Sequence, residues 1–343
     1  MTAVVTGGGG HIGANLVREL LARGERVRVI EFARSRALEG LPIELVEGDV
    51  LHMPSLKEAF ADADVVYHLA GVVSVDSDRD GQICRVNIDG AENAARAALA
   101  VGVRRLVHFS SCDALDPRPL DQPLDERRPR IAWDDRRHSV YERAKAEGER
   151  RVRAVVREGV DAVIVHPSAV IGPHDFGPSY MGRVFLELYH RRLPGLVRGG
   201  FDFADARDVA AGAIAAAERG RRNESYLLAG HYLSLHELAR LASRFTGVAP
   251  PRLTVPLWLA RLAAPGWATY KRWRGQKALY TTHSLRIVGR RQRVLADKAE
   301  RELGYHRRPI DETIFDLHRW FADVNWIRGA ALPSELAAAP SRS

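Results

Sequence analysis

The sequence contains few cysteines and no long apolar run, and each shortage removes a class of protein. Only two of its 343 residues are cysteine, Cys84 and Cys112, which cannot form a disulfide framework and show no metal-binding spacing. No segment approaches the roughly 18 consecutive apolar residues of a membrane-spanning helix. The first apolar run, 3–5, is far too short for a secretory signal. We therefore expect a protein of the reducing cytoplasm with no spanning segment.

Acidic residues are also in the minority, with 43 Asp and Glu against 51 Lys and Arg, which gives a net charge of +8. Such a balance can indicate nucleic acid, an anionic membrane or an anionic substrate as partner. The arginines occur as scattered pairs with acids among them, however, and no basic stripe is interleaved with aromatic residues. This pattern is typical of a solvated surface, so we predict no nucleic-acid partner.

Short apolar runs alternate with longer amphipathic ones through the first half of the chain, which is the pattern of parallel β/α units. We therefore predict an α/β fold with a Rossmann-type, doubly wound parallel sheet. The expected strands are 2–6, 26–31, 43–47, 64–68, 104–110 and 162–166, and the expected helices are 11–22, 55–61, 82–100 and 139–158.

The rhythm breaks after Pro167, where proline and glycine separate shorter patterns. We predict a Rossmann domain at 1–166, a smaller mixed substrate lobe at 167–330 with some segments returning to the sheet, and a disordered tail at 331–343. The segment 115–135 is expected to form a loop over the site. In the second half, helices are expected at 179–191, 206–217, 235–245 and 297–303, and a strand at 226–229.

Four consecutive glycines, 7–10, stand between the first expected strand and the first expected helix. A glycine turn there lets the backbone approach a pyrophosphate, whose charge is favoured by the amides at the helix start. Gly8, Gly10 and Gly13 spell G-x-G-x-x-G, whereas Gly7, Gly10 and Gly13 spell G-x-x-G-x-x-G. The residues alone leave both registers open.

An acid ends or follows each of the next two expected strands. Glu31 lies about 20 residues beyond the glycines, where a carboxylate accepts hydrogen bonds from the adenine ribose and repels a 2′-phosphate. It favours NAD over NADP, although Arg34 and Arg36 lie close by. The Asp49 carboxylate could accept a hydrogen bond from the adenine amino group, or it could simply stabilise a turn.

Tyr141 and Lys145 stand four residues apart in a helical pattern, so they share one face. An ammonium near a phenol is expected to lower the pKa of the tyrosine, which can then exchange a proton with a carbonyl or an alcohol. Ser110 and Ser111 close the fifth expected strand, where a hydroxyl would hydrogen-bond the reacting oxygen. The glycine loop, the acid, the serines and the Tyr-x-x-x-Lys pair form a specific set in this order.

The chain resembles an extended short-chain dehydrogenase/reductase of the NAD-dependent epimerase/dehydratase family over roughly residues 1–325. HPSAVIGP is similar to the dihydroflavonol-reductase and 3β-hydroxysteroid-dehydrogenase-like branch. The matching segments are TGGGGHIG at 6–13, GDV at 48–50, YHLAG at 67–71, VNIDGAEN at 86–93, HFSS at 108–111, YERAK at 141–145, HPSAVIGP at 166–173 and DARDVAAG at 205–212.

The resemblance implies that the glycines work in the wider register and that Ser111, Tyr141 and Lys145 are the catalytic residues. It also implies that Lys145 holds the nicotinamide ribose, that Asn87 supports the helix around it and that His166 lies near the nicotinamide. The predicted cofactor-binding residues are Gly7, Gly10, His11, Ile12, Gly13, Glu31, Asp49, Val50, Leu69, Ala70, Gly71, Tyr141, Lys145, Pro167 and Ser168.

Two departures from the sugar-nucleotide branch bear on the substrate. Phe201 stands where those enzymes usually carry a diphosphate-clamping arginine, and Ser168 where they often have asparagine. We expect reversible hydride transfer between NAD and a secondary alcohol or ketone of a small, fairly apolar substrate. The alternatives are a sugar-nucleotide epimerase or dehydratase, with phosphate arginines such as Arg183 or Arg198, and a non-catalytic NAD-binding sensor.

Two surfaces bear on partners. Residues 255–273 mix leucine and tryptophan with basic residues, which suits a membrane surface or packing of the smaller lobe, and the proline and glycine within them favour packing. Relatives often pair through the helices expected at 82–100 and 139–158, so the resemblance implies a homodimer through this face.

Overall fold

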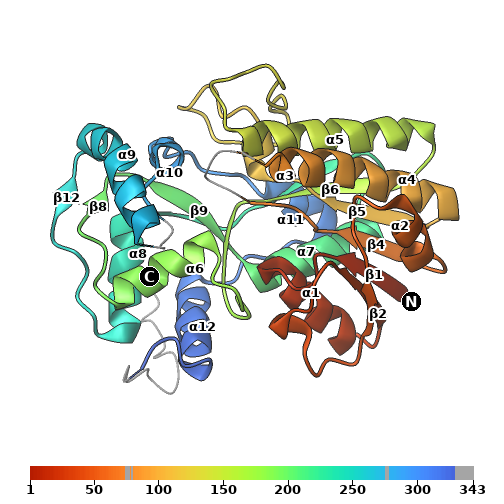
Figure 1. Cartoon of the computed structure of the whole chain (residues 1–343), viewed down its shortest axis with the longest axis horizontal. Helices are drawn as coiled ribbons and strands as arrows, with labels where there is room; N and C mark the ends of the chain where they lie inside the picture. The colour runs from red at the N-terminus through yellow and green to blue at the C-terminus, as the bar shows by residue number, and fades with distance from the viewer. Residues whose placement is uncertain (74–77, 79, 275–277, 329–343) are drawn as a thin grey trace.

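The computed structural model of the chain describes residues 1–73, 78, 80–274 and 278–328. The expected tail, 331–343, lies outside these described residues. Figure 1 shows a larger lobe around a parallel sheet and a smaller lobe at the opposite end of the molecule.

Seven parallel strands form the larger lobe, in the order β10-β6-β5-β4-β1-β2-β3. The central strands are buried along their whole length because helices cover both faces, which explains their continuous apolar runs. All seven lie within one residue of the expected ends, and the doubly wound Rossmann-type fold is confirmed. The strands are β1 (Thr2–Thr6), β2 (Arg26–Glu31), β3 (Glu44–Glu47), β4 (Val65–His68), β5 (Arg105–Phe109), β6 (Ala162–Pro167) and β10 (Ser225–Leu228).

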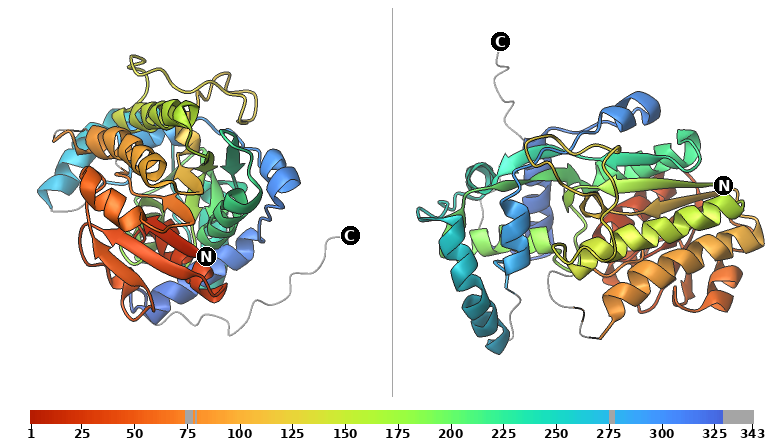
Figure 2. Two further views of the ribbon diagram at one scale, coloured as in Figure 1. Left: turned by 90° about the vertical axis from the view of Figure 1, so that its right-hand side faces the viewer. Right: turned by 90° about the horizontal axis from the view of Figure 1, so that it is seen from above.

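Helices flank this sheet on both sides, as the end-on view of Figure 2 shows. On one face α1 (His11–Ala22) packs against α7 (Ala206–Arg219). On the other face α4 (Ala91–Val101) packs between α2 (Met53–Phe60) and α5 (Val140–Glu158). A capping box of the S-x-x-E type starts α5, which fixes the beginning of the helix that carries the predicted tyrosine and lysine.

The helix expected at 82–100 is interrupted. It consists of a short turn α3 (Gln82–Cys84), a π-helical segment η2 (Arg85–Gly90) and α4. Within η2 the Asn87 side chain accepts a hydrogen bond from the Val72 N–H at 3.1 Å and donates to the Val72 carbonyl at 2.8 Å. π-Helical turns occur often at functional sites, and this one fixes the chain that follows β4.

The remaining elements belong mainly to the smaller lobe, whose core contains Phe185, Phe203 and Phe321. The sequence predicted the helices that begin at 180, 235 and 297 but missed the other three and the short strands. These elements are β7 (Ala169–Ile171), β8 (Leu196–Val197), β9 (Gly200–Asp205), β11 (His231–Ser234), β12 (Thr254–Val255), α6 (Tyr180–Tyr189), α8 (Leu235–Thr246), α9 (Leu257–Trp273), α10 (Thr282–Val288), α11 (Asp297–Leu303) and α12 (Ile310–Asp323).

Two small sheets organise this lobe, β11-β9-β7 and β12-β8. The chain leaves β9 into α7, which covers the large sheet, and then enters β10. β10 pairs with β6 from Ser225 beside Ile164 to Leu228 beside Pro167. The second half of the chain therefore supplies β10 and the helices α7 and α11 to the larger lobe, because α11 packs against α7 and β10. No helix within the described ranges is long and apolar enough to cross a bilayer.

Candidate active site

A cavity of about 590 Å³ lies at the carboxyl ends of the parallel strands, between the two lobes. The larger lobe contributes the loop after β1, the ends of β4, β5 and β6, and the first turns of α5, while the smaller lobe contributes α6, β9 and α10. Doubly wound folds bind ligands at this edge, where the strand order reverses between β1 and β4.

Three of the loop glycines, Gly7, Gly10 and Gly13, line the cavity. Gly7 has a φ of +72°, and a Cβ on Gly13 would lie 2.2 Å from the Gly7 carbonyl oxygen, so both positions require glycine. Gly8 packs inward instead, where a Cβ would lie 2.5 Å from Cγ1 of Val29. The glycines that face the cavity are those of the wider spacing.

The start of α1 fits the pyrophosphate of a dinucleotide. Its N-cap is Gly10, which makes no side-chain cap hydrogen bond to the first-turn amides, so these amides are available to an anion. His11 and Ile12 also line the cavity. The imidazole Nε2 of His11 lies 3.1 Å from the carbonyl oxygens of Gly172 and Pro173, which ties α1 to the start of the smaller lobe.

Four predicted cofactor residues lie outside the cavity lining, namely Ala70 after β4 and three residues at the ends of β2 and β3. The Glu31 carboxylate accepts a hydrogen bond from the Gly9 N–H, and burial raises the pKa of Glu31 while this hydrogen bond opposes the rise. Asp49 accepts a hydrogen bond from the Leu51 N–H at 2.9 Å and so caps a turn. Val50 is buried. Glu31 therefore stands beside the glycine loop, whereas Asp49 is engaged in its own turn.

The ends of β4 and β6 supply further predicted residues. Leu69 and Gly71 line the cavity after β4, and Pro167 and Ser168 line it after β6. Ala70 packs its backbone beneath the glycine loop. The two strand ends thus lie on opposite sides of β5, which carries the serines.

Ser111, Tyr141 and Lys145 all line the cavity. The Ser111 hydroxyl hydrogen-bonds the Tyr141 phenol. The neighbouring Ser110 is buried, and its hydroxyl donates to Glu149 at 2.9 Å. Between the two serines, the geometry therefore favours Ser111 as the hydroxyl that a substrate can meet.

The pKa of Tyr141 is raised, which corrects one expectation from the sequence. Burial is the main cause, the charge of Asp113 adds to it, and the hydrogen bond from Ser111 opposes it. Lys145 donates from Nζ to the Phe109 carbonyl at 2.6 Å, and burial lowers the pKa of Lys145 to about 8. The prediction that Tyr141 has a lowered pKa is wrong for this arrangement, because burial and the charge of Asp113 raise its pKa.

Glu149 lies one helical turn after Lys145 and is fully buried beneath the site. Its carboxylate lies 2.8 Å from His166 Nε2 and accepts hydrogen bonds from Arg130 Nε at 2.7 Å and Arg153 Nε at 2.9 Å. Burial alone would raise the pKa of Glu149, but His166 and the two arginines hold it well below its usual value. This negative charge opposes the effect of burial on the pKa of Lys145.

Asp113 and Arg290 are among the cavity residues that escaped the sequence analysis. Asp113 is 26% exposed, and burial raises its pKa to about 6 although Arg290 opposes the rise. Arg290 lies 3.5 Å from Asp113 and donates at 2.5 Å to the buried Glu142, which follows Tyr141 in the chain. The position of Asp113 two residues after Ser111 was a signal that could have found it. Arg290 sits in a basic run that gave no such signal.

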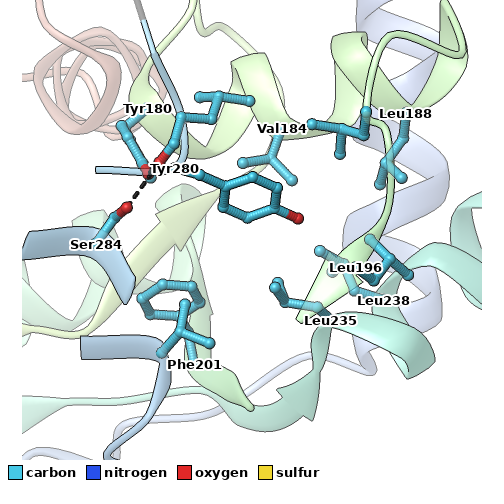
Figure 3. A pocket seen from close by; sticks show the side chains of 12 residues that line it. Tyr180, Val184, Leu188, Leu196, Phe201, Leu235, Leu238, Tyr280 and Ser284 are labelled. Atoms are coloured by element: carbon cyan, nitrogen blue, oxygen red, sulfur yellow. Dashed lines mark hydrogen bonds between the residues drawn. The ribbon is translucent and has the colours of Figure 1, made fainter. Parts of the chain in front are cut away.

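A second, smaller cavity of about 20 Å³ adjoins the first and shares Tyr180, Phe201 and Ser284 with its lining. Figure 3 shows the side chains around it, including Val184 and Leu235, which make its wall almost entirely apolar. Phe201, at the position compared above with an arginine of the sugar-nucleotide enzymes, thus lines both cavities.

The parallel sheet, the glycine loop and a cavity lined by serine, tyrosine and lysine define an extended short-chain dehydrogenase/reductase. Residues 3–229 match the NAD dependent epimerase/dehydratase family, and the chain belongs to that family.

Relatives along nearly the whole chain include reductases. The chain is 36% identical over 337 residues to the sterol demethylase protein B of Methylococcus capsulatus, covering 95% of this chain and 100% of that protein. It is 32% identical to a putative dihydroflavonol 4-reductase of Synechocystis, covering 94% and 95%. The crystal structure of gox2253 superposes with a TM-score of 0.83 at 28% identity, covering 95% and 99%. These likenesses agree with the branch that the sequence predicted.

Proposed function

We propose that the protein transfers a hydride reversibly between NAD and a secondary alcohol or ketone of a small, fairly apolar molecule. The observation that carries the proposal is the convergence of Ser111, Tyr141 and Lys145 on one cavity that the glycine loop also lines. NAD, when bound, supplies the hydride donor or acceptor. Gly10 and the first-turn amides of α1 would hold its pyrophosphate, and Lys145 its nicotinamide ribose.

The protein's own residues handle the proton. Tyr141 gives a proton to the carbonyl oxygen of a ketone, or takes one from an alcohol, at its phenolic oxygen. Ser111 orients the same oxygen, because its hydroxyl already contacts the phenol. The raised pKa of Tyr141 keeps the phenol neutral near pH 7. A neutral phenol is the proton donor that ketone reduction needs.

Apolar walls support the substrate class. Phe201 and Tyr180 line both the main cavity and the apolar side cavity, so an apolar part of a substrate in the main cavity would lie against apolar side chains of the smaller lobe. We therefore favour a ketone on an alicyclic or alkyl framework over a polar sugar.

The first test is the nicotinamide content of the freshly purified protein, followed by assays with apolar ketones. We expect little bound nucleotide, a melting temperature that rises with added NAD, and net consumption of NADH with a suitable ketone. Near-stoichiometric retained NAD without net NADH consumption by any ketone would contradict the proposal and favour an epimerase cycle, in which the hydride returns to the substrate.

One observation favours the sugar-nucleotide alternative. Arg183 lines the main cavity, and its buried Nε has no hydrogen-bond partner among the described residues. A guanidinium in that state suits a phosphate oxygen. Replacing Arg183 by Gln should leave ketone reduction nearly unchanged under our proposal, whereas a sugar-nucleotide enzyme would lose substrate affinity.

Glu31→Ala should relax the preference for NAD over NADP. We expect NAD to bind about tenfold more weakly, because one charged hydrogen-bond acceptor is lost. The affinity for NADP should stay the same or increase, because the carboxylate no longer repels the 2′-phosphate. The ratio of the two dissociation constants is the readout. Damage to the glycine loop through the lost Gly9 contact would weaken both cofactors equally. Glu47→Ala, at the end of neighbouring β3, is the matched control, and an unchanged ratio in Glu31→Ala would refute the cofactor assignment.

Asp113→Asn should shift the pH dependence of alcohol oxidation. Asp113 has a pKa of about 6, so it becomes anionic as pH rises through this value, and its charge then raises the pKa of Tyr141. Removing the charge lowers the pKa of Tyr141, and the alkaline rise of kcat/KM for oxidation should move to lower pH. Asp116→Asn is the control because Asp116 pairs with Arg118 outside the cavity lining. A profile that stays in place would show that Asp113 does not act on the tyrosine.

A further inference from the structure

Helix α9 lies on the outer side of the smaller lobe, at the end of the molecule far from the parallel sheet (Figure 1). Only one of its faces packs inward. Ala264 is buried there, and Leu257 and Ala260 are partly buried against the core of the lobe. Lys271 pairs with Glu187 on this same inner side. Packing against the smaller lobe, which the sequence favoured for 255–273, therefore explains the residues of the inner face only.

The opposite face is apolar and open. Trp258 is 67% exposed, Leu262 74% and Trp273 81%. At about 100° per residue these three side chains fall within roughly 60° of one another, on the side away from Leu257. Leu259 and Tyr270 flank them at 41% and 45% exposure. We call Trp258, Leu259, Leu262, Tyr270 and Trp273 the α9 face.

The chain around this face carries charge of one sign. Between Glu237 and Asp297 there are twelve Lys and Arg residues and no Asp or Glu. Arg252, Arg261 and Arg274 are exposed in or next to α9, and no ion pair joins any of the three to another described residue. A row of exposed tryptophan, leucine and tyrosine bordered by such cations matches a helix that lies in the interface of an anionic bilayer.

We propose that the α9 face docks on an anionic lipid surface. Its tryptophans and leucines would enter the boundary between headgroups and acyl chains, and the arginines would contact lipid phosphates. A second copy of the chain suits this face less well. A symmetric pair would bring two acid-free basic segments together, and like charges across an interface repel. This proposal does not depend on the proposed function.

Docking there would place the active site close to the lipid. α10 packs against α9, and its residues His283, Ser284, Ile287 and Arg290 line the main cavity. One helix therefore separates the α9 face from the site. An apolar molecule dissolved in the bilayer would have a short path to the cavity.

The test is co-sedimentation of the full chain with vesicles of phosphatidylcholine alone and of phosphatidylcholine mixed equally with phosphatidylglycerol. We expect binding to the mixed vesicles that weakens with added salt, and much weaker binding to the neutral ones. Trp258→Glu combined with Leu262→Glu should weaken binding to the mixed vesicles by at least about tenfold, because acids replace the inserted apolar groups. Trp273→Ala should cause a smaller loss in the same direction.

Leu120→Glu is the matched control, since Leu120 is 49% exposed on the loop near the larger lobe. It should bind as the unmodified chain does, and all variants should melt within a few degrees of it because the changed side chains are exposed. Equal pelleting with and without mixed vesicles would overturn the proposal. So would unchanged binding by the double variant. A dimer that the double variant dissociates would also overturn it and would assign the face to a second copy.

Discussion

Tyr141→Phe should reduce turnover by about a hundred- to ten-thousand-fold, the usual contribution of a positioned acid or base. In the proposed function the phenol exchanges a proton with the reacting oxygen, and phenylalanine keeps the ring that packs near Ile83, Ile88 and Ala144. NAD binding should be spared, because the glycine loop and Lys145 are untouched. The measurements are steady-state turnover with an active ketone and the melting-temperature rise caused by NAD.

Tyr180→Phe is the matched control, because Tyr180 also lines the main cavity but donates its hydroxyl to the Leu279 carbonyl. It should lower turnover only modestly. If Tyr141→Phe kept full turnover, the proposed chemistry would be wrong. An NAD-binding sensor would behave differently again, since its output would survive the loss of this hydroxyl.

Glu149→Gln should destabilise the fold by about 3 kcal/mol, the scale of breaking a buried ion pair by removing one partner. Glu149 is fully buried, and Arg130 and Arg153 would be left near it without their shared counter-charge. Glu158→Gln, on the exposed end of the same helix, is the control. Its partner Arg96 is 44% exposed, so its loss should cost at most about 1 kcal/mol. Urea unfolding of the three proteins compares these free energies.

The same pair of variants has a defined pH dependence. The pKa of Glu149 is held well below its usual value of 4.5 in the folded protein. Its ionised form therefore contributes stability above about pH 4.5, and this contribution disappears as pH falls toward the folded pKa. The gap in stability between the unmodified chain and Glu149→Gln should shrink in acid. A gap that is constant with pH would show that packing, and not charge, explains the loss.

The larger lobe was predictable because its strands are buried on both faces and read as apolar runs between glycine and amphipathic segments. Both ends of the helix His11–Ala22 were predicted correctly, because its amphipathic pattern starts directly after the glycine loop. The π-helical turn at Asn87 was not predicted, because the hydrogen bonds that Asn87 makes there join it to Val72, fifteen residues earlier, and no local sequence signal marks them. Three strands of the smaller lobe, β7, β8 and β12, are only two or three residues long, which is too short for an alternating pattern.

The candidate site divides in the same way. Ser111, Tyr141 and Lys145 follow from one strand end and one helix spacing, which are local. Arg290 reaches the cavity only because α10 folds back onto the start of α5, where Glu142 binds it. The raised pKa of Tyr141 likewise depends on burial and on the charge of Asp113, which spacing along a helix does not reveal.

The return of β10 to the large sheet has a consequence for dissecting the molecule. A fragment that ends after Pro167 would lack β10, and β6 would become an unpaired edge strand with open N–H and C=O groups. It would also lose α7, leaving the apolar surface of α1 uncovered. Such a truncation should self-associate instead of folding as a free nucleotide-binding module. If the chain were split into two halves, both would have to be expressed together, so that β10 of the second half can pair with β6 of the first.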